Sequence, residues 1–386
     1  MIPSEERLRL VTRRQSLHDP ADAQLLEKLL AEKEQPKIAW VTAPTGKPHV
    51  GYLVPLAKLV DFLRAGLDVT VYCVDVYSFL VNYVHPMHVV AHRREYYRLL
   101  VSAVLQSLGV QPGAVKFVSE SSIAYSKEFV TDMQRLCALM TQQDARNTCE
   151  EVANTAMLSP MLCCIHQSLA EEYLAMDIQF GGEDQAGLFA HARQFMPLLG
   201  YRQRLHLMNP MVAGLDGLKM SSSKPAATKI EFLDDPPTVR RKVQHAACPP
   251  RQMVENGILE LLKHVLVPVS ELRLERARGQ TGLNTEEGAG GGSGSCGGRP
   301  FVADGAPDGA VFSVARAARQ PGMEEEHLHF ASYAELERAY VSGAIEPAPL
   351  KAAVEAAFND LLAPIRDVYA QSKEWQEVDR AAYPDQ

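Results

Sequence analysis

Short apolar runs and helical periodicity alternate along the amino-terminal half of the chain. Residues 5–35 carry leucines at helical spacing and end at a proline, which closes the helical segment. A short apolar run, Lys37–Thr42, is followed by a turn rich in proline and glycine, and then by apolar residues at i, i+3, i+4 and i+7 up to Gly66. A second β-rich run, Asp68–Val74, completes a β-α-β unit, which predicts a parallel sheet.

Further segments continue this alternation and predict a sheet of roughly five strands. The additional strand candidates are Ala114–Val118, Met176–Phe180 and Arg204–Met208. The helical stretches between them include Met87–Leu108, Lys127–Met140 and Asp184–Leu199. We therefore expect an α/β domain over residues 1–235, with a mainly helical insertion around residues 84–165.

The pattern after Pro236 is mainly helical. Periodic segments occur at Val239–Ala246, Met253–Val265, Tyr333–Tyr340 and Leu350–Tyr369. Between them, residues 280–300 contain the string EGAGGGSGSCGGRP, a composition that cannot bury apolar surface. We expect a second, mainly α-helical domain over residues 236–386, with a flexible, disordered loop at 280–300.

Composition and charge narrow the class of protein. The chain has 386 residues, of which 46% are hydrophobic and 22% charged, so it can bury at least one large core. No apolar run approaches the roughly 18 residues of a membrane span, and the first residues lack a secretory signal, so we expect a cytoplasmic protein with no membrane partner. The 7 cysteines form no CxxC pair, which indicates reduced thiols and no metal site. Because the net charge is −8, any nucleic-acid binding needs a local basic face.

Two loops have the composition of phosphate-binding sites. Residues 44–52 lie between the first strand and the first long helix, where free backbone N–H groups attract anions, and His49 adds an imidazole donor. Residues 217–225 hold lysines and three consecutive serines, which can close over a triphosphate and stabilise departing pyrophosphate. Alone, each loop also fits an ordinary turn or a solvated surface loop. Their occurrence in one chain favours a nucleotide site.

The same two loops match motifs of a known family. His49–Tyr52 resembles the HIGH motif, and Lys219–Ser223 resembles the KMSKS motif, of class I aminoacyl-tRNA synthetases. The surrounding sequence resembles tyrosyl-tRNA synthetases of the eukaryotic and archaeal type over nearly the whole chain. The supporting segments are residues 45–49, 60–66, 180–185, 206–211 and 382–385.

The resemblance implies a Rossmann-like catalytic domain, an insertion that mediates dimerisation and a helical anticodon-binding domain. It also implies that a carboxylate attacks the α-phosphate of ATP and that an acceptor then takes the acyl group, mainly through positioning and charge stabilisation. By motif position, the catalytic residues would be His49, Lys219, Ser221 and Ser222. The ATP-binding residues would be Thr45, Gly46, His49, Gly51, Asp184, Lys219 and Met220. Mg²⁺ would accompany ATP, an amino acid would be the substrate, and tRNA and a second copy of the chain are candidate partners.

The expected amino-acid pocket departs from the family pattern. A tyrosine and an aspartate that bind the substrate's phenol in the family correspond here to Ala39 and Ala170, whose side chains form no hydrogen bond. Further changed positions expected to line the pocket are Tyr72, Tyr77, Ile123, Ala124 and Cys163. Each change alone fits ordinary core packing, but their gathering in one pocket indicates a changed substrate. Gln167 and Gln185, which help to hold the substrate's ammonium group in the family, are present.

Three functions are compatible with these observations. The first is a diverged ATP-dependent ligase that activates an amino acid other than tyrosine and passes it to a small-molecule amine, forming an amide bond, or to tRNA. The second is a genuine tyrosine-tRNA ligase whose pocket uses substitute partners such as Tyr72 or Tyr77. The third is a catalytically silent relative that binds or regulates. Because His49, Asp184 and Lys219 are all in place, the sequence speaks against the third function, and the intact ATP motifs together with the changed pocket favour the first.

Overall fold

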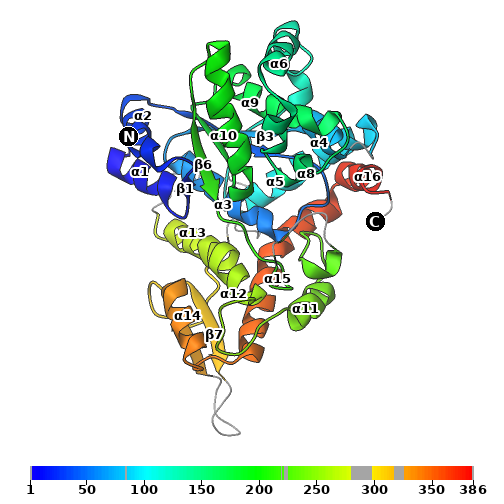
Figure 1. The fold of residues 1–386 in the computed structure, drawn as a ribbon. Coiled ribbons are helices and arrows are strands. Elements are labelled where there is room, and N and C mark those ends of the chain that lie inside the picture. The colour runs from blue at the N-terminus through cyan, green and yellow to red at the C-terminus, as the bar shows by residue number, and fades with distance from the viewer. Residues whose placement is uncertain are drawn as a thin grey trace.

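A computed structural model describes residues 2–82, 85–218, 220, 225–279, 298–316 and 326–384 of the chain. Figure 1 shows two parts, with a sheet wrapped by helices above and a smaller, mainly helical part below. This arrangement confirms the expected Rossmann-like α/β domain followed by a mainly α-helical one. Across the described ranges, no helix combines the length and the apolar character that crossing a membrane requires.

The central sheet has six strands in the order β1-β6-β5-β2-β3-β4. Its parallel strands coincide with the predicted apolar runs and are β2 (Lys37–Thr42), β3 (Asp68–Cys73), β4 (Lys116–Ser119), β5 (Ile178–Gly182) and β6 (Leu205–Asn209). The remaining strand, β1 (Ser16–Leu17), pairs antiparallel with β6 and is too short for a periodic pattern to reveal it.

Helices surround this sheet close to the positions that the periodicity predicts. They are α1 (Ser4–Thr12), α2 (Ala23–Glu32), α3 (Leu53–Arg64), α4 (Asp75–Asn82), α5 (Met87–Ser107), α6 (Lys127–Leu139), α7 (Gln142–Arg146), α8 (Glu150–Ala153), α9 (Cys163–Tyr173) and α10 (Ala186–Phe195). The span 84–165, expected to be a mainly helical insertion, also contains β4, close to the strand candidate Ala114–Val118, and β4 pairs with β3. The helices α6 to α9 lie between β4 and β5 in the chain.

The strand β2 separates two buried cores because its successive side chains point to opposite faces. Ile38 and Trp40 belong to the large core, together with buried residues of α3 and α5. Ala39 lies in a smaller cluster on the other side, together with Ala170 of α9. The carboxyl end of β2 therefore emerges between two tightly packed layers.

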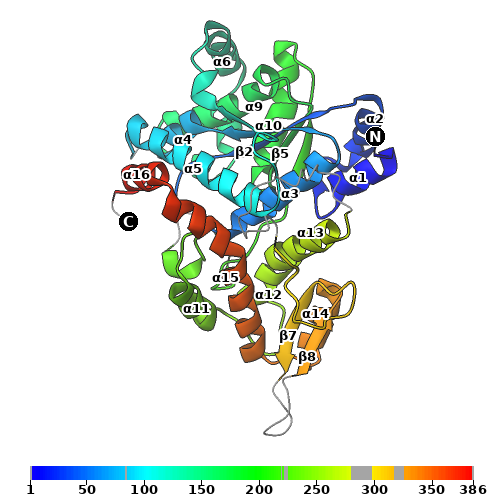
Figure 2. The same cartoon turned by 180° about the vertical axis from the view of Figure 1, so that it is seen from behind.

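The lower part contains helices and one hairpin. Its helices are α11 (Pro236–His245), α12 (Gly257–Leu261), α13 (Val267–Ala277), α14 (Tyr333–Val341) and most of α15 (Pro347–Gln371), and the last helix, α16 (Lys373–Ala382), lies beside the upper part. The hairpin of β7 (Phe312–Arg316) and β8 (Glu326–Phe330) is not evident from the sequence pattern. The loop expected at 280–300 falls almost entirely outside the described residues. In Figure 2, α15 crosses towards the upper part and α16 packs against α5.

Candidate active site

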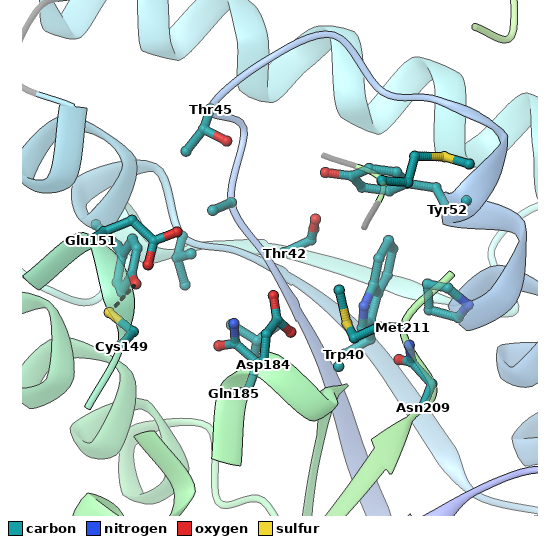
Figure 3. Close-up of a pocket in the computed structure, with 18 of the residues that line it drawn as sticks. Trp40, Thr42, Thr45, Tyr52, Cys149, Glu151, Asp184, Gln185, Asn209 and Met211 are labelled. Carbon is teal, nitrogen blue, oxygen red and sulfur yellow. Dashed lines mark hydrogen bonds between the residues drawn. The ribbon is translucent and has the colours of Figure 1, made fainter. Parts of the chain in front are cut away.

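A cavity of about 620 Å³ opens at the carboxyl ends of β2 and β5. These two strands are neighbours in the sheet. The chain continues from β2 to β3 on one side and from β5 to β6 on the other, so the cavity lies at the point where the strand order reverses. Ligands of open α/β sheets bind at such points. Figure 3 shows Asp184 and Gln185 rising from the segment after β5, with Glu151 and Cys149 on one side and Trp40 and Tyr52 on the other.

One end of the cavity, called the nucleotide end because the sequence predicts that ATP binds there, brings together residues from both predicted phosphate loops. Thr45, His49, Gly51, Asp184 and Met220 all line it. Gly46 does not line it, and the carbonyl oxygen of Gly46 accepts hydrogen bonds from two tyrosine hydroxyls. Lys219, Ser221 and Ser222, the other expected catalytic residues, lie outside the described residues.

His49 is held as a neutral hydrogen-bond donor. Its Nδ1 accepts a hydrogen bond from the Gly51 backbone N–H at 3.2 Å, so the ring hydrogen must sit on Nε2. Burial, together with the charge of Lys229, lowers the pKa of His49 to about 3. A Cβ at position 51 would lie 2.8 Å from the imidazole, which explains the glycine there. Neutral Nε2–H can therefore donate to a phosphate oxygen across the physiological pH range.

The loop that carries Thr45 is braced by residues far away in the sequence. The Gly46 carbonyl oxygen accepts from the Tyr97 hydroxyl at 2.8 Å and from the Tyr383 hydroxyl at 3.0 Å. Arg93 donates to the Thr45 carbonyl oxygen at 2.7 Å and to the Ala382 carbonyl oxygen at 3.1 Å. The carboxyl-terminal segment and α5 together therefore fix the backbone of the nucleotide end.

A short segment after β5 forms the opposite wall of the cavity. Gly182 and Asp184 are so close that a Cβ at position 182 would meet Asp184 Oδ1 at 2.5 Å. Sequence reasoning missed several other lining residues. They are Trp40, Val41, Thr42, Ala43, Tyr52, Pro55, Val74, Val81, Cys149, Glu150, Glu151, Gly182, Asn209, Pro210, Met211 and Val212. Tyr52, Gly182 and residues 209–211 fall in the matching motifs and segments, which was a usable signal, whereas Glu150 and Glu151 are reached only through the fold.

The amino-acid end differs from the sequence expectation. Of the positions expected to line it, Tyr77, Gln167 and Gln185 do so. The others do not border the cavity, and they are Ala39, Tyr72, Ile123, Ala124, Cys163 and Ala170. Ala39 of β2 and Ala170 of α9 belong to one buried apolar cluster, and the Tyr72 ring lies buried in the same cluster. Most of the expected pocket is therefore a buried apolar cluster behind the cavity wall.

The cluster behind the wall contains one polar atom with no described partner. Ala39, Tyr72, Cys163 and Ala170 are each at most 1% exposed. The Tyr72 hydroxyl makes no hydrogen bond among the described residues, and burial raises the pKa of Tyr72 well above its usual value. The neighbouring Tyr77 hydroxyl instead lies 3.9 Å from the Cys149 sulfur. The Tyr72 hydroxyl is thus the polar side-chain group of this cluster that has no hydrogen-bond partner among the described residues.

Comparisons with known proteins agree with the fold and the motifs. The family model described as tRNA synthetases class I (W and Y) matches residues 31–285. The cytoplasmic tyrosine–tRNA ligase of Saccharomyces cerevisiae is 36% identical over 389 residues, which cover 99% of this chain and 89% of that protein. The cytoplasmic tyrosine–tRNA ligase of Gallus gallus is 37% identical, and the match covers 98% of this chain but 64% of that longer protein.

A solved structure supports the same relationship. The tyrosyl-tRNA synthetase of Archaeoglobus fulgidus, complexed with L-tyrosine, superposes with a TM-score of 0.74 at 27% identity. The match covers 95% of this chain and 99% of that one. The sequence-based resemblance is therefore confirmed over almost the whole chain.

Proposed function

Because the chain belongs to the class I tyrosyl-tRNA synthetases and is an ATP-dependent ligase, we propose that its cavity forms an aminoacyl adenylate and that the aminoacyl group is then transferred to tRNA. In the first step an amino-acid carboxylate oxygen bonds to the α-phosphorus of ATP and pyrophosphate leaves. In the second, a ribose hydroxyl of tRNA attacks the acyl carbon and AMP leaves. One observation carries the proposal: a single cavity is lined by both His49 and Asp184 and by Gln167 and Gln185.

The residues around the nucleotide end can support this reaction without a side chain that acts as a general acid or base. Neutral His49 would donate Nε2–H to a phosphate oxygen, and Asp184 would accept from the ribose hydroxyls. Three carboxylates line the cavity, those of Glu150, Glu151 and Asp184, and Mg²⁺ is usually held by substrate phosphates with one or two carboxylates. Bound with ATP, the ion would offset charge on the departing pyrophosphate. Positioning and electrostatics then account for most of the rate.

Tyrosine is the first candidate substrate, because the relatives named above are tyrosine–tRNA ligases. Of the two substitute partners that the sequence suggests for a phenol, Tyr77 lines the cavity, whereas the Tyr72 hydroxyl is buried behind its wall. Tyr77 is therefore the group that could pair with a phenol, in place of the side chains absent at Ala39 and Ala170.

An amino acid other than tyrosine is the second candidate, and the buried apolar cluster favours it. A site that pairs a substrate hydroxyl rejects the analogue lacking it by roughly 10⁴–10⁵, and alanines at 39 and 170 supply no such partner.

Transfer to tRNA is the proposal for the acceptor, with residues 236–386 as the anticodon-binding part, a homodimer as the assembly and the cytoplasm as the location. The names of the relatives support this acceptor and this location. Transfer to a small-molecule amine stays a prediction of the sequence, and the comparisons favour tRNA over it.

ATP–pyrophosphate exchange with a panel of amino acids tests the proposal. Exchange with tyrosine, strongly preferred over phenylalanine, supports the first candidate. Exchange with a different amino acid, or loss of the preference, supports the second. If purified protein exchanges with no amino acid, adenylate formation is refuted. Charging of purified tRNA, compared with product formation from added amines without tRNA, then identifies the acceptor.

A further inference from the structure

A buried chain of hydrogen bonds runs from the interior of the sheet to the cavity wall. It starts at Glu171 of α9, which is 1% exposed and whose Oε1 lies 2.6 Å from His206 Nε2. Gln179 of β5 donates from Nε2 to the same oxygen at 2.7 Å. Gln167 in turn donates from Nε2 to Gln179 Oε1 at 2.8 Å and to Gln185 Oε1 at 3.2 Å. Gln167 and Gln185 both line the cavity.

The direction of this chain follows from elementary donor and acceptor rules. A carboxylate only accepts hydrogen bonds, so Gln179 must turn its NH₂ group towards Glu171 and its carbonyl oxygen towards Gln167. Gln167 must then present its NH₂ group to Gln179. Both N–H bonds of Gln167 are thereby used within the protein. A single buried acceptor thus decides the orientation of two amide groups.

The consequence at the cavity is a fixed acceptor. Among the described residues, nothing donates to Gln167 Oε1, and this oxygen is the part of the amide left for a ligand. Gln185 receives one of these bonds on its own carbonyl oxygen, which leaves its NH₂ group for the cavity. The Gln167 carbonyl oxygen can accept from the ammonium group of an amino acid, and the Gln185 NH₂ group can donate to its carboxylate. A reversed Gln167 would instead turn N–H groups against the ammonium.

We propose that Glu171, acting through Gln179, is the positioning residue that keeps the Gln167 carbonyl oxygen turned towards the substrate's ammonium group. This inference rests on the proposed function, because it assumes that an amino acid occupies this end of the cavity. It goes further in assigning a role to two buried residues that do not line the cavity. Without the acceptor at Glu171, either orientation of Gln179 and Gln167 becomes available.

The test compares two replacements of Glu171 in ATP–pyrophosphate exchange, using the amino acid that supports the fastest exchange by the unmodified protein. Glu171→Met keeps the size and removes the acceptor, and we expect KM for the amino acid to rise about tenfold or more, as for loss of a hydrogen bond to a charged group. KM for ATP should stay within about twofold. Glu171→Gln should retain the original KM values, because two donors at one oxygen hold its carbonyl in place.

A second readout separates positioning from general damage. The des-amino analogue of the same amino acid carries no ammonium group, so its inhibition constant should be unchanged in Glu171→Met. Gln179→Met breaks the chain one link later and should reproduce the effect with Glu171 and His206 intact, which keeps the test available if Glu171→Met does not fold. Glu172→Met is the matched control, since Glu172 lies next along α9 and pairs with Arg204 instead.

The outcomes are distinguishable. If the folded variants bind the amino acid and its des-amino analogue as the unmodified protein does, or lose both equally, the positioning role is overturned. If Glu171→Gln behaves like Glu171→Met, an acceptor at this place is not what matters, and the proposal is likewise overturned. If the unmodified protein supports no exchange, the proposed function itself fails, and this inference fails with it.

Discussion

The two ends of the cavity are built in different ways. At the nucleotide end, a loop presents Thr45, His49 and Gly51 to the cavity, and hydrogen bonds from behind hold its backbone. At the amino-acid end, most of the expected residues have become part of a tightly packed core, among them Ala39 and Ala170. The residues of the loop can stay the same while the residues at the amino-acid end change, because the loop depends on hydrogen bonds to its backbone and the other end depends on side-chain packing. Under the proposed function, this difference implies that the residues that bind ATP and those that bind the amino acid can change separately.

Replacing Lys219 should have the largest effect on the rate of adenylate formation, and it tests the role proposed for the nucleotide end. Lys219 lies in the second motif, outside the described residues, and its charge would stabilise the departing pyrophosphate. We expect Lys219→Ala to slow adenylate formation by about 10²–10³ with little loss of amino-acid binding. Single-turnover kinetics measure the first quantity, and equilibrium binding measures the second. Equal losses in both would mean that the loop does not act on the transition state.

Removing the Tyr383 hydroxyl tests the brace behind the loop and should have a smaller effect. Tyr383→Phe deletes one of the two hydrogen bonds to the Gly46 carbonyl oxygen, each worth roughly 0.5–1.5 kcal/mol. We expect KM for ATP to rise by about twofold to tenfold, with KM for the amino acid unchanged. Tyr333→Phe, on α14 in the lower part, is the control and should change neither. A change in KM for the amino acid alone would contradict the assignment of this loop to the nucleotide.

Removing the Tyr72 hydroxyl sharpens the comparison at the amino-acid end. A buried polar group without a partner costs roughly 1–3 kcal/mol, so Tyr72→Phe should raise the free energy of unfolding of the ligand-free protein by about 1 kcal/mol. Urea denaturation measures this change. The preference for tyrosine over phenylalanine should stay unchanged, because this hydroxyl does not border the cavity. Destabilisation of the ligand-free protein would show that the hydroxyl already has a partner.

Local sequence patterns were sufficient to predict the parallel strands and the residues of the nucleotide loop that line the cavity. The run Lys37–Thr42 became β2, and His49 and Asp184 reached one cavity because both follow the carboxyl ends of adjacent strands. The pattern could not show that Ala39 and Ala170 would be withdrawn from the cavity, since this depends on how closely β2 and α9 pack. Contacts such as that between Gly46 and Tyr383 join distant residues and leave no periodic signal.

The brace on the nucleotide loop has a consequence for synthesis of the protein. Gly46 and Tyr383 are 337 positions apart, and chains are made from the amino terminus onwards. A ribosome therefore completes the loop long before it adds the tyrosine that secures it. A chain that stops between residues 209 and 383 would contain every strand of the central sheet and would keep the hydrogen bonds from Tyr97 and Arg93 to the loop, but it would lack the one from Tyr383. A stop codon or a proteolytic cut that removes Tyr383 should accordingly raise KM for ATP, because one of the two hydrogen bonds to the Gly46 carbonyl oxygen is lost.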